Sequence, residues 1–485
     1  MPETAIAPAE RTRLQAVDGF ALIALLCMVL SLSWQFRDSI IDDGYIYLRV
    51  VDNILAGHGW VFNIGERVNP CTSIPYTLLL VLIRLVCRSP VGTILTGFGI
   101  GLLGLSWVQY WAFRELNRAL GFVTALASIW EPILFRSVGM ETSVFLACVV
   151  GSAWAFQRNA QWTCGILSGL AALSRPEGLV LILLMSILQG IGKRGSFKSA
   201  QIGFLAIVIP WLIFSQLYFG SLVSNSILAK AEQVQVASMA FHTSWGIVLL
   251  QHMWMPVVTL SLSVIGIGVA LSAIRRGRFY GSIVVLFGLI QAVAYTILRA
   301  PFGYRWYFAP ANLAINMSVI FAGAFLMDLL RKRFQSDGVS SANLWRIGTA
   351  LACLLLVSRL GAAPFQMPSP YESQNYVTIG RWIDHHTPPN ENVACMEIGY
   401  IGFYSRRPIV DMAGLIHPKA LGALRNLDLS WWFTTENPPS MVLIHAPIWP
   451  GEPSPYWGPL WKTFGQTYHR VLRIGSVSVY RRNGT

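Results

Sequence analysis

Apolar runs long enough to cross a membrane recur along the first part of the chain and then stop. A helix needs roughly 20 predominantly apolar residues to cross the hydrocarbon core of a bilayer. Runs of this kind lie between Phe20 and Leu360, whereas Pro, Asn, Asp, Glu and His return from about Pro364 onward. The pattern predicts an α-helical polytopic membrane domain over residues 1–361 and a soluble α/β domain over residues 362–485.

Basic clusters between the apolar runs set the expected topology. Short cytoplasmic loops are enriched in Lys and Arg, so the chain should cross an even number of times between consecutive clusters. The N-terminus is then cytoplasmic and the C-terminal domain lies outside. The clusters contain Arg11, Arg13, Arg114, Arg118, Arg158, Lys193, Arg194, Lys198, Arg275, Arg276, Arg278, Arg331, Lys332 and Arg333. About eleven spans are predicted, at residues 20–36, 91–113, 119–134, 142–157, 162–174, 178–191, 202–217, 257–273, 280–298, 312–330 and 346–361.

The expectation of an even number of crossings also decides how two doubtful segments lie. Ile74–Cys87 has Pro75 near its start and Arg84 inside it, and a span there would turn every later basic cluster outward. We therefore expect a juxtamembrane helix on the outer face. Trp162–Gln189 has basic flanks on both sides, so it should cross twice and turn at Arg175-Pro176.

The polar tail shows the signals of a small α/β domain. Tyr371–His386 has a helical pattern and ends before Pro388-Pro389. The expected strands are short and apolar, and they lie at Asn392–Glu397, Pro408–Asp411, Met441–His445, Val471–Ile474 and Val477–Arg481.

Composition narrows the class of protein further. The chain is 54% hydrophobic and only 12% charged, which is about half the charge of a typical soluble protein. The formal net charge of +13 lies mostly in the short loops, so we expect no nucleic-acid partner. The first run lacks a cleavage site and should be an anchor. Seven scattered cysteines indicate no disulfide framework, and we do not expect a bridge between Cys71 and Cys395, although both could face outward.

Two adjacent carboxylates, Asp42 and Asp43, follow the first span. Acidic groups beside a membrane are costly unless they are solvated, paired or used in chemistry. The residues after them have apolar positions at helical spacing, which predicts an amphipathic surface helix over Asp43–Leu55. Capping the start of that helix would explain one aspartate, so capping and chemistry remain open for the pair.

Other predicted outer turns also carry charge. Glu141 opens a span, and Arg175 and Glu177 share a Pro-containing turn, so helix capping and an internal ion pair are the plain explanations. Arg299 and Arg305 lie on the side where cations are disfavoured, which suggests an anionic partner such as a lipid phosphate.

Three classes of function fit a polytopic protein with acids and arginines on one face. A transporter or flippase for lipid-linked sugars would place ionisable groups near the membrane midplane and often shows inverted repeats. Mid-span charge is sparse here and we find no internal repeat. Chemistry at the outer interface is therefore favoured over transport, while a non-catalytic role in assembling envelope polysaccharide stays open as a third alternative.

The order of motifs resembles that of bacterial polytopic glycosyltransferases of the GT-C class over nearly the whole chain. The mycobacterial terminal arabinofuranosyltransferase-like branch is the most similar subgroup, because Asn69-Pro70-Cys71 stands where more distant groups have His-Pro-Pro. The segments that carry the resemblance are Asp42–Arg49, Gly57–Asn63, Gly139–Thr142, Ser174–Gly178, Tyr218–Ser221 with Asn225 and Lys230, Tyr304–Tyr307, and Ile398–Tyr404 with Asp411 and Gly414-Leu415.

The resemblance implies a sugar donor on a polyprenyl phosphate and an acceptor that is a cell-envelope glycan, lipid or protein. It implies that the first-loop aspartate, Asp42 or Asp43, is the catalytic base and that Glu141 is a second acid. No His/Cys cluster predicts a metal, although the two aspartates could instead bind a divalent ion. The expected donor and phosphate residues are Arg305, Arg175, Arg299, Lys230 and Tyr304, and the expected substrate-binding residues are His58, Glu177, Asn225 and Tyr400.

Overall fold

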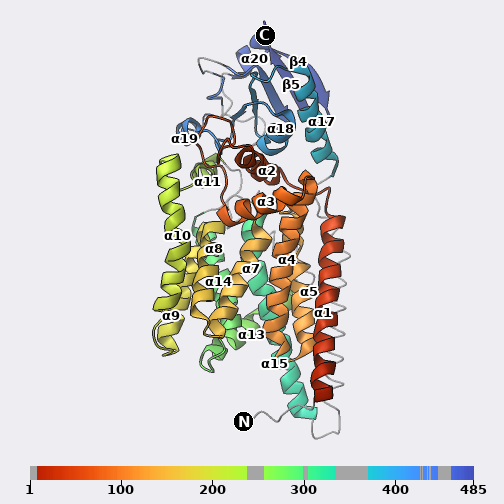
Figure 1. Ribbon diagram of the computed structural model, residues 1–485, viewed down its shortest axis with the longest axis vertical. Helices are drawn as coiled ribbons and strands as arrows, with labels where there is room; N and C mark the ends of the chain where they lie inside the picture. The colour runs from red at the N-terminus through yellow and green to blue at the C-terminus, as the bar shows by residue number, and fades with distance from the viewer. Residues whose placement is uncertain are drawn as a thin grey trace.

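The computed structural model describes residues 8–236, 256–298, 304–334, 370–445 apart from 427, 429, 434, 436 and 437, and 460–484. A bundle of long helices forms the lower part of the molecule in Figure 1, and an α/β domain stands on one end of it. Two shorter helices, α2 (Asp42–Leu55) and α3 (Ile74–Val86), lie between these two parts.

The long helices follow the apolar runs of the sequence. Within the described residues, seven helical segments are long and apolar enough to cross a membrane, so the chain is a multi-pass membrane protein. The predicted span at 346–361 falls outside the described residues. The elements concerned are α1 (Pro8–Gln35), α4 (Pro90–Arg114), α5 (Arg118–Ile129) with α6 (Pro132–Phe135), α10 (Lys198–Phe219), α13 (Pro256–Ile274), α14 (Tyr280–Ile297) and α15 (Ala309–Phe334).

Three shorter helices complete the described part of the bundle. They are α7 (Thr142–Gln157), α8 (Gln161–Ser174) and α9 (Leu179–Ile191). The segment predicted to cross twice is indeed two helices, joined by the 3-10 turn η1 (Pro176–Gly178). Proline suits the first position of such a turn because its missing N–H needs no partner there. The turn places Arg175 and Glu177 at one end of the bundle.

Helix α3 lies across the end of the bundle and does not run through it (Figure 1). Its start is fixed by the Ser73 side chain, which accepts a hydrogen bond from the Tyr76 amide at 3.3 Å, and by Pro75 in the first turn. Helix α2 packs against α3 on one side and against the α/β domain on the other.

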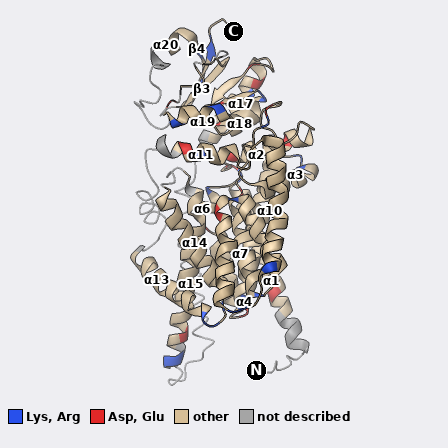
Figure 2. Ribbon diagram, turned by 90° about the vertical axis from the view of Figure 1, so that its left-hand side faces the viewer, with Lys and Arg blue, Asp and Glu red and all other residues tan. Residues whose placement is uncertain are grey.

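Three of the basic clusters meet at the end of the bundle opposite the α/β domain. Arg158 forms an ion pair with Glu115 at 3.0 Å, and Arg194 donates to the Phe156 carbonyl at 2.9 Å. Charged residues are sparse along the middle of the bundle (Figure 2). These contacts agree with an even number of crossings between the clusters.

The C-terminal part is an α/β domain with a five-stranded sheet of order β2-β1-β3-β5-β4. Strands β2, β1 and β3 run parallel, while β5 pairs antiparallel with both β3 and β4. The predicted helix and all five predicted strands are present. The elements are α17 (Pro370–His386), β1 (Val393–Cys395), α18 (Ile398–Ser405), β2 (Ile409–Asp411), α19 (Pro418–Arg425), β3 (Met441–His445), α20 (Leu460–Thr467), β4 (Tyr468–Ile474) and β5 (Val477–Arg482).

Two charged residues of α2 hold the ends of α18. The Asp42 carboxylate accepts hydrogen bonds from the amides of Gly399 at 2.9 Å and Tyr400 at 2.7 Å, at the start of α18. Arg49 donates to the carbonyls of Gly402 and of Arg407, the latter at 2.8 Å, at the far end. A helix is positive at its N-terminus and negative at its C-terminus, so the two charges match the two ends.

The described cysteines form no disulfide. Cys71 and Cys395 are both unbonded and buried.

Candidate active site

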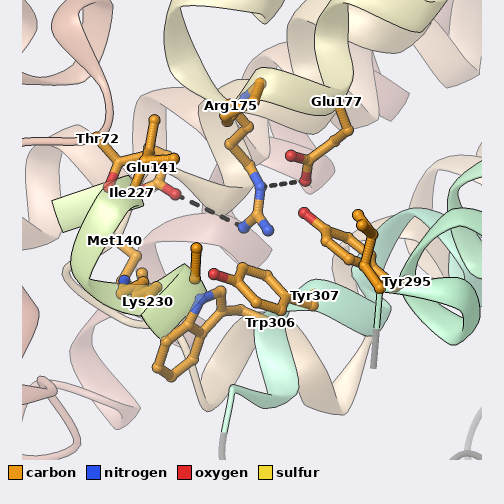
Figure 3. Close-up of a pocket in the computed structure, with 13 residues that line it drawn as sticks. Thr72, Met140, Glu141, Arg175, Glu177, Ile227, Lys230, Tyr295, Trp306 and Tyr307 are labelled. Atoms are coloured by element: carbon orange, nitrogen blue, oxygen red, sulfur yellow. Dashed lines mark hydrogen bonds and ion pairs between the residues drawn. The ribbon is translucent and has the colours of Figure 1, made fainter. Parts of the chain in front are cut away.

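A cavity of about 350 Å³ lies at the end of the bundle that faces the α/β domain (Figure 3). Its wall comes from turns and helix ends that are far apart in the sequence. The lining residues are Thr72, Met140, Glu141, Arg175, Pro176, Glu177, Ile227, Lys230, Ala231, Tyr295, Leu298, Trp306 and Tyr307. The sequence therefore predicted correctly that charged residues of separate turns meet on one face.

Arg175 organises the charged wall of this cavity. Its Nε atom lies 2.6 Å from a Glu177 oxygen and its Nη1 atom lies 3.6 Å from a Glu141 oxygen, and Figure 3 shows the guanidinium between them. The guanidinium also stacks 4.9 Å from the centre of the Tyr307 ring. All three charged side chains are nearly inaccessible to water, so each depends on the others for its charge.

Tyr47 connects this wall to helix α2. Its hydroxyl donates to Glu141 at 2.9 Å and accepts from the Ser73 amide at 3.1 Å. Burial raises the pKa of Glu141 above its usual range, although Arg175 opposes that effect. Burial and the Arg175 charge thus act on the Glu141 carboxyl in opposite directions.

Asp43 lies in a small crevice next to the cavity. The crevice shares Thr72, Met140 and Lys230 with the cavity wall. Asp43 and Tyr47 are one helical turn apart on α2, so they lie on the same face of that helix. The Asp43 carboxylate is 3.6 Å from the Lys230 ammonium and is still 24% exposed. It is therefore the partly open carboxylate beside the cavity.

Lys230 lines both the cavity and the adjoining crevice. It belongs to α11 (Asn225–Val236), and its ammonium lies 5.3 Å from the centre of the Tyr304 ring. Burial by itself lowers the pKa of Lys230, but the Asp43 carboxylate raises it above its ordinary value. Lys230 therefore carries a positive charge at neutral pH.

The charges that line the described cavity balance. Glu141 and Glu177 offset Arg175 and Lys230, so an anion would need further cations. Arg305 is the candidate on the adjoining turn η2 (Arg305–Phe308), next to Trp306 and Tyr307 of the cavity wall. The Arg305 side chain and the whole of Arg299 lie outside the described part of the structure.

Four residues expected in the site lie elsewhere. His58 is exposed on the first outer loop. Asp42 is half-buried and accepts from two amides of α18, Tyr400 donates its hydroxyl to the Ile40 carbonyl, and Asn225 donates to the Gly414 carbonyl at 2.7 Å. These three connect the first loop and α11 to the α/β domain.

The sequence did not point to Tyr295 of the cavity wall or to Tyr47 of the adjoining crevice. Tyr295 sits in an apolar run and looks like an ordinary aromatic of a span. Tyr47 had a usable signal, because it is four positions after Asp43 in a predicted helix. Among the residues that the structure describes, no group of three His, Cys, Asp or Glu side chains could hold a metal ion.

The fold is that of polytopic glycosyltransferases of the GT-C class. ArnT from Cupriavidus metallidurans, in the apo state and bound to undecaprenyl phosphate, matches with TM-scores of 0.61 and 0.59 at 15% and 13% identity. Each match covers 96% of this chain and 98% of the ArnT chain. The mycobacterial arabinofuranosyltransferase AftD matches with a TM-score of 0.51 at 14% identity, over 96% of this chain and 40% of its own.

Sequence relatives point to one branch of that class, as the resemblance of motifs predicted. A terminal β-(1→2)-arabinofuranosyltransferase of Mycobacterium tuberculosis is 32% identical over an alignment of 228 residues, and the match covers 41% of this chain and 36% of the relative. The enzyme of the same name from Corynebacterium glutamicum is 52% identical over 50 residues, 10% of this chain and 7% of its own. The chain thus matches about a third or less of each relative's length. A family described as a domain of unknown function (DUF8728) matches residues 366–481.

Proposed function

We propose that this protein is a membrane glycosyltransferase that moves a sugar, with arabinofuranose as the leading candidate, from a polyprenyl-phosphate donor to a cell-envelope acceptor. The observation that carries the proposal is Asp43, a partly open carboxylate opposite Lys230 at the edge of the cavity. The GT-C fold and the similarity to arabinofuranosyltransferases support it.

In the proposed reaction Asp43 is the general base. The acceptor hydroxyl attacks the anomeric carbon of the sugar and gives its proton to the Asp43 carboxylate. The bond between the anomeric carbon and the phosphate oxygen breaks, and the lipid phosphate leaves with the bonding electrons. Base catalysis of this kind contributes typically about 10²–10⁴-fold.

Cations around the cavity would stabilise the leaving phosphate. Lys230 is placed for this, because it lies between the Asp43 crevice and the cavity. Arg305 and Arg299 are the expected further cations. Arg175 already faces two carboxylates, so we assign it to holding Glu141 and Glu177 in place.

The proposed location is the inner membrane, with the N-terminus in the cytoplasm and the C-terminal domain in the periplasm. The grouping of basic loops at the end of the bundle away from that domain supports this orientation. A polyprenyl donor would then reach the cavity from the outer leaflet, and no nucleotide or ATP would be required there.

A direct test uses purified protein and synthetic polyprenyl-phosphate sugars. We expect transfer of a labelled pentose from the polyprenyl phosphate to an arabinan-like acceptor, and no transfer from a nucleotide sugar. Reconstitution of the same protein in liposomes distinguishes a glycosyltransferase from a flippase for the lipid-linked sugar. Translocation of the donor across the liposome membrane without any glycosidic product would overturn the proposal.

A further inference from the structure

The loop after strand β2, residues 411–416, is shaped by one buried carboxylate. Asp411 is fully buried at the end of β2. One of its oxygens accepts from the Ala413 amide at 2.8 Å, and the other accepts from the Ile416 amide at 3.0 Å. Gly414 has a φ of +84°, a conformation that favours glycine. The carboxylate therefore gathers the loop's N–H groups on its inner side.

The outward carbonyls of the same loop hold helix α11. Gln233 donates its side-chain amide to the Ala413 carbonyl at 2.7 Å. Asn225 donates to the carbonyls of Gly414 at 2.7 Å and Leu415 at 2.9 Å. Asn225 is the first residue of α11 and Gln233 lies near its end, so the loop is hydrogen-bonded to both ends of the helix.

Lys230 lies between these two attachment points. Its ammonium faces Asp43 at 3.6 Å, and Leu415 of the loop lines the crevice that contains both charges. A lysine side chain is flexible, so the place of its charge depends on the position of its helix. A displacement of about 1 Å at a reacting centre can cost about 10²-fold in rate.

We propose that Asp411 is a positioning residue, which shapes the 411–416 loop so that α11 holds Lys230 opposite Asp43. The proposal rests on the proposed glycosyl transfer. It gives the C-terminal domain a part in that reaction, because the 411–416 loop of this domain positions α11. Asp411 lines neither the cavity nor the crevice, so it acts through the 411–416 loop and through α11, which this loop holds.

The test compares Asp411→Asn with a matched control in the full-length protein. The amide of the variant keeps one acceptor but turns an NH₂ group toward a loop N–H, so one of the two loop bonds is lost. We expect kcat/KM for a polyprenyl-phosphate sugar to fall by about tenfold. Asp384→Asn is the control, because Asp384 pairs with Arg407 in the same domain and, among the described residues, not with α11. It should stay within about twofold of the original protein.

A double-mutant cycle separates positioning from general damage to the domain. If Asp411 acts through Lys230, then Asp411→Asn added to Lys230→Met causes little further loss. Gln233→Ala and Asn225→Ala cut the same connection from the side of α11 and should reproduce the loss in kcat/KM. These two variants keep the test informative if Asp411→Asn does not fold.

The outcomes separate the two proposals. Additive losses in the cycle, or normal donor kinetics in Gln233→Ala and Asn225→Ala, would overturn the role of Asp411 while Lys230→Met remained impaired. If Lys230→Met and Asp43→Asn both transferred sugar normally, the proposed roles of Lys230 and Asp43 would fail. If the original protein transferred no sugar from the polyprenyl-phosphate donor, the proposed function itself would fail.

Discussion

The Arg175 guanidinium is nearly inaccessible to water and has two carboxylates as partners. Removing one member of a buried charge network leaves the others uncompensated, which is costly in a low-dielectric interior. Arg175 therefore matters first for the shape of the cavity wall. We assign it no direct part in binding a donor phosphate, because its Nε and Nη1 atoms already face Glu177 and Glu141.

Arg175→Met should lower the free energy of unfolding by about 3–5 kcal/mol, because Glu141 and Glu177 would stay buried without their cation. Thermal unfolding in detergent measures the loss. Arg37→Met is a matched control, since Arg37 pairs with Asp38 on the surface, where such pairs contribute about 0–1 kcal/mol. Equal losses in the two variants would show that the Arg175 network is not a stabilising unit.

Asp411 should make stability depend on pH in a defined direction. Burial raises the pKa of Asp411 to about 6 from 3.8, so the folded state holds a proton that the unfolded state releases. This group's contribution is present at low pH and is lost as pH rises toward about 6, at up to about 1.4 kcal/mol per pH unit. The difference in unfolding free energy between the original protein and Asp411→Asn should therefore favour the original protein more at about pH 5 than at about pH 7.5. A difference that does not change with pH, or that changes in the opposite direction, would contradict this.

Helix α2 serves both halves of the molecule. Its Asp43 and Tyr47 face the cavity region, whereas its Asp42 and Arg49 hold the two ends of α18. Neighbouring aspartates thus differ in role because successive side chains of a helix point in different directions. Any movement of the C-terminal domain would be transmitted to the helix that carries the proposed base.

Asp42→Asn should be tolerated better than the same change at Asp43. The amide oxygen can still accept from one of the two α18 amides, so we expect a stability cost of about 1–2 kcal/mol and only a small change in kcat. Unfolding in detergent and steady-state kinetics on one preparation measure both quantities. A loss of kcat as large as that of Asp43→Asn, without a matching loss of stability, would reassign the base to Asp42.

At the scale of the whole molecule, the bundle and the C-terminal domain enclose the cavity region from opposite sides. The carboxyl ends of β1 and β2 lead into α18 and the 411–416 loop, and both of these contact α2 or α11. Basic loops lie at the other end of the bundle. This polarity supports the proposed orientation, in which the cavity lies on the periplasmic side of the inner membrane.

Surface labelling tests that polarity in intact cells. A cysteine replacing Ser196, in the basic loop after α9, should not react with a membrane-impermeant maleimide because it faces the cytoplasm. A cysteine replacing the exposed Gly465 on α20 should react once the outer envelope is permeable. Reaction at position 196 and protection at position 465 would reverse the proposed orientation.

Local patterns predicted much of this molecule. Apolar runs and basic clusters predicted the helices of the bundle, the pair of helices that meet at Arg175 and the crosswise α3, because length and charge act locally. The strands of the tail also carried their own signals. The site was only partly predictable. Nothing near Asp42 indicates that its partners are Gly399 and Tyr400, and α11 lacks a clear apolar period, so the position of Lys230 depends on contacts that only the fold creates.

The most direct test of the central claim is the turnover of Asp43→Asn with a polyprenyl-phosphate pentose in purified protein. Loss of the proton acceptor should lower kcat by about 10²-fold or more, while KM for the donor stays similar or falls, because Lys230 would be freed from its carboxylate. Asp52→Asn is the matched control, since Asp52 lies on the same helix and pairs with Arg84 away from the cavity. Near-normal kcat in Asp43→Asn, beside a normal Asp52→Asn, would show that Asp43 is not the base and would contradict the mechanism.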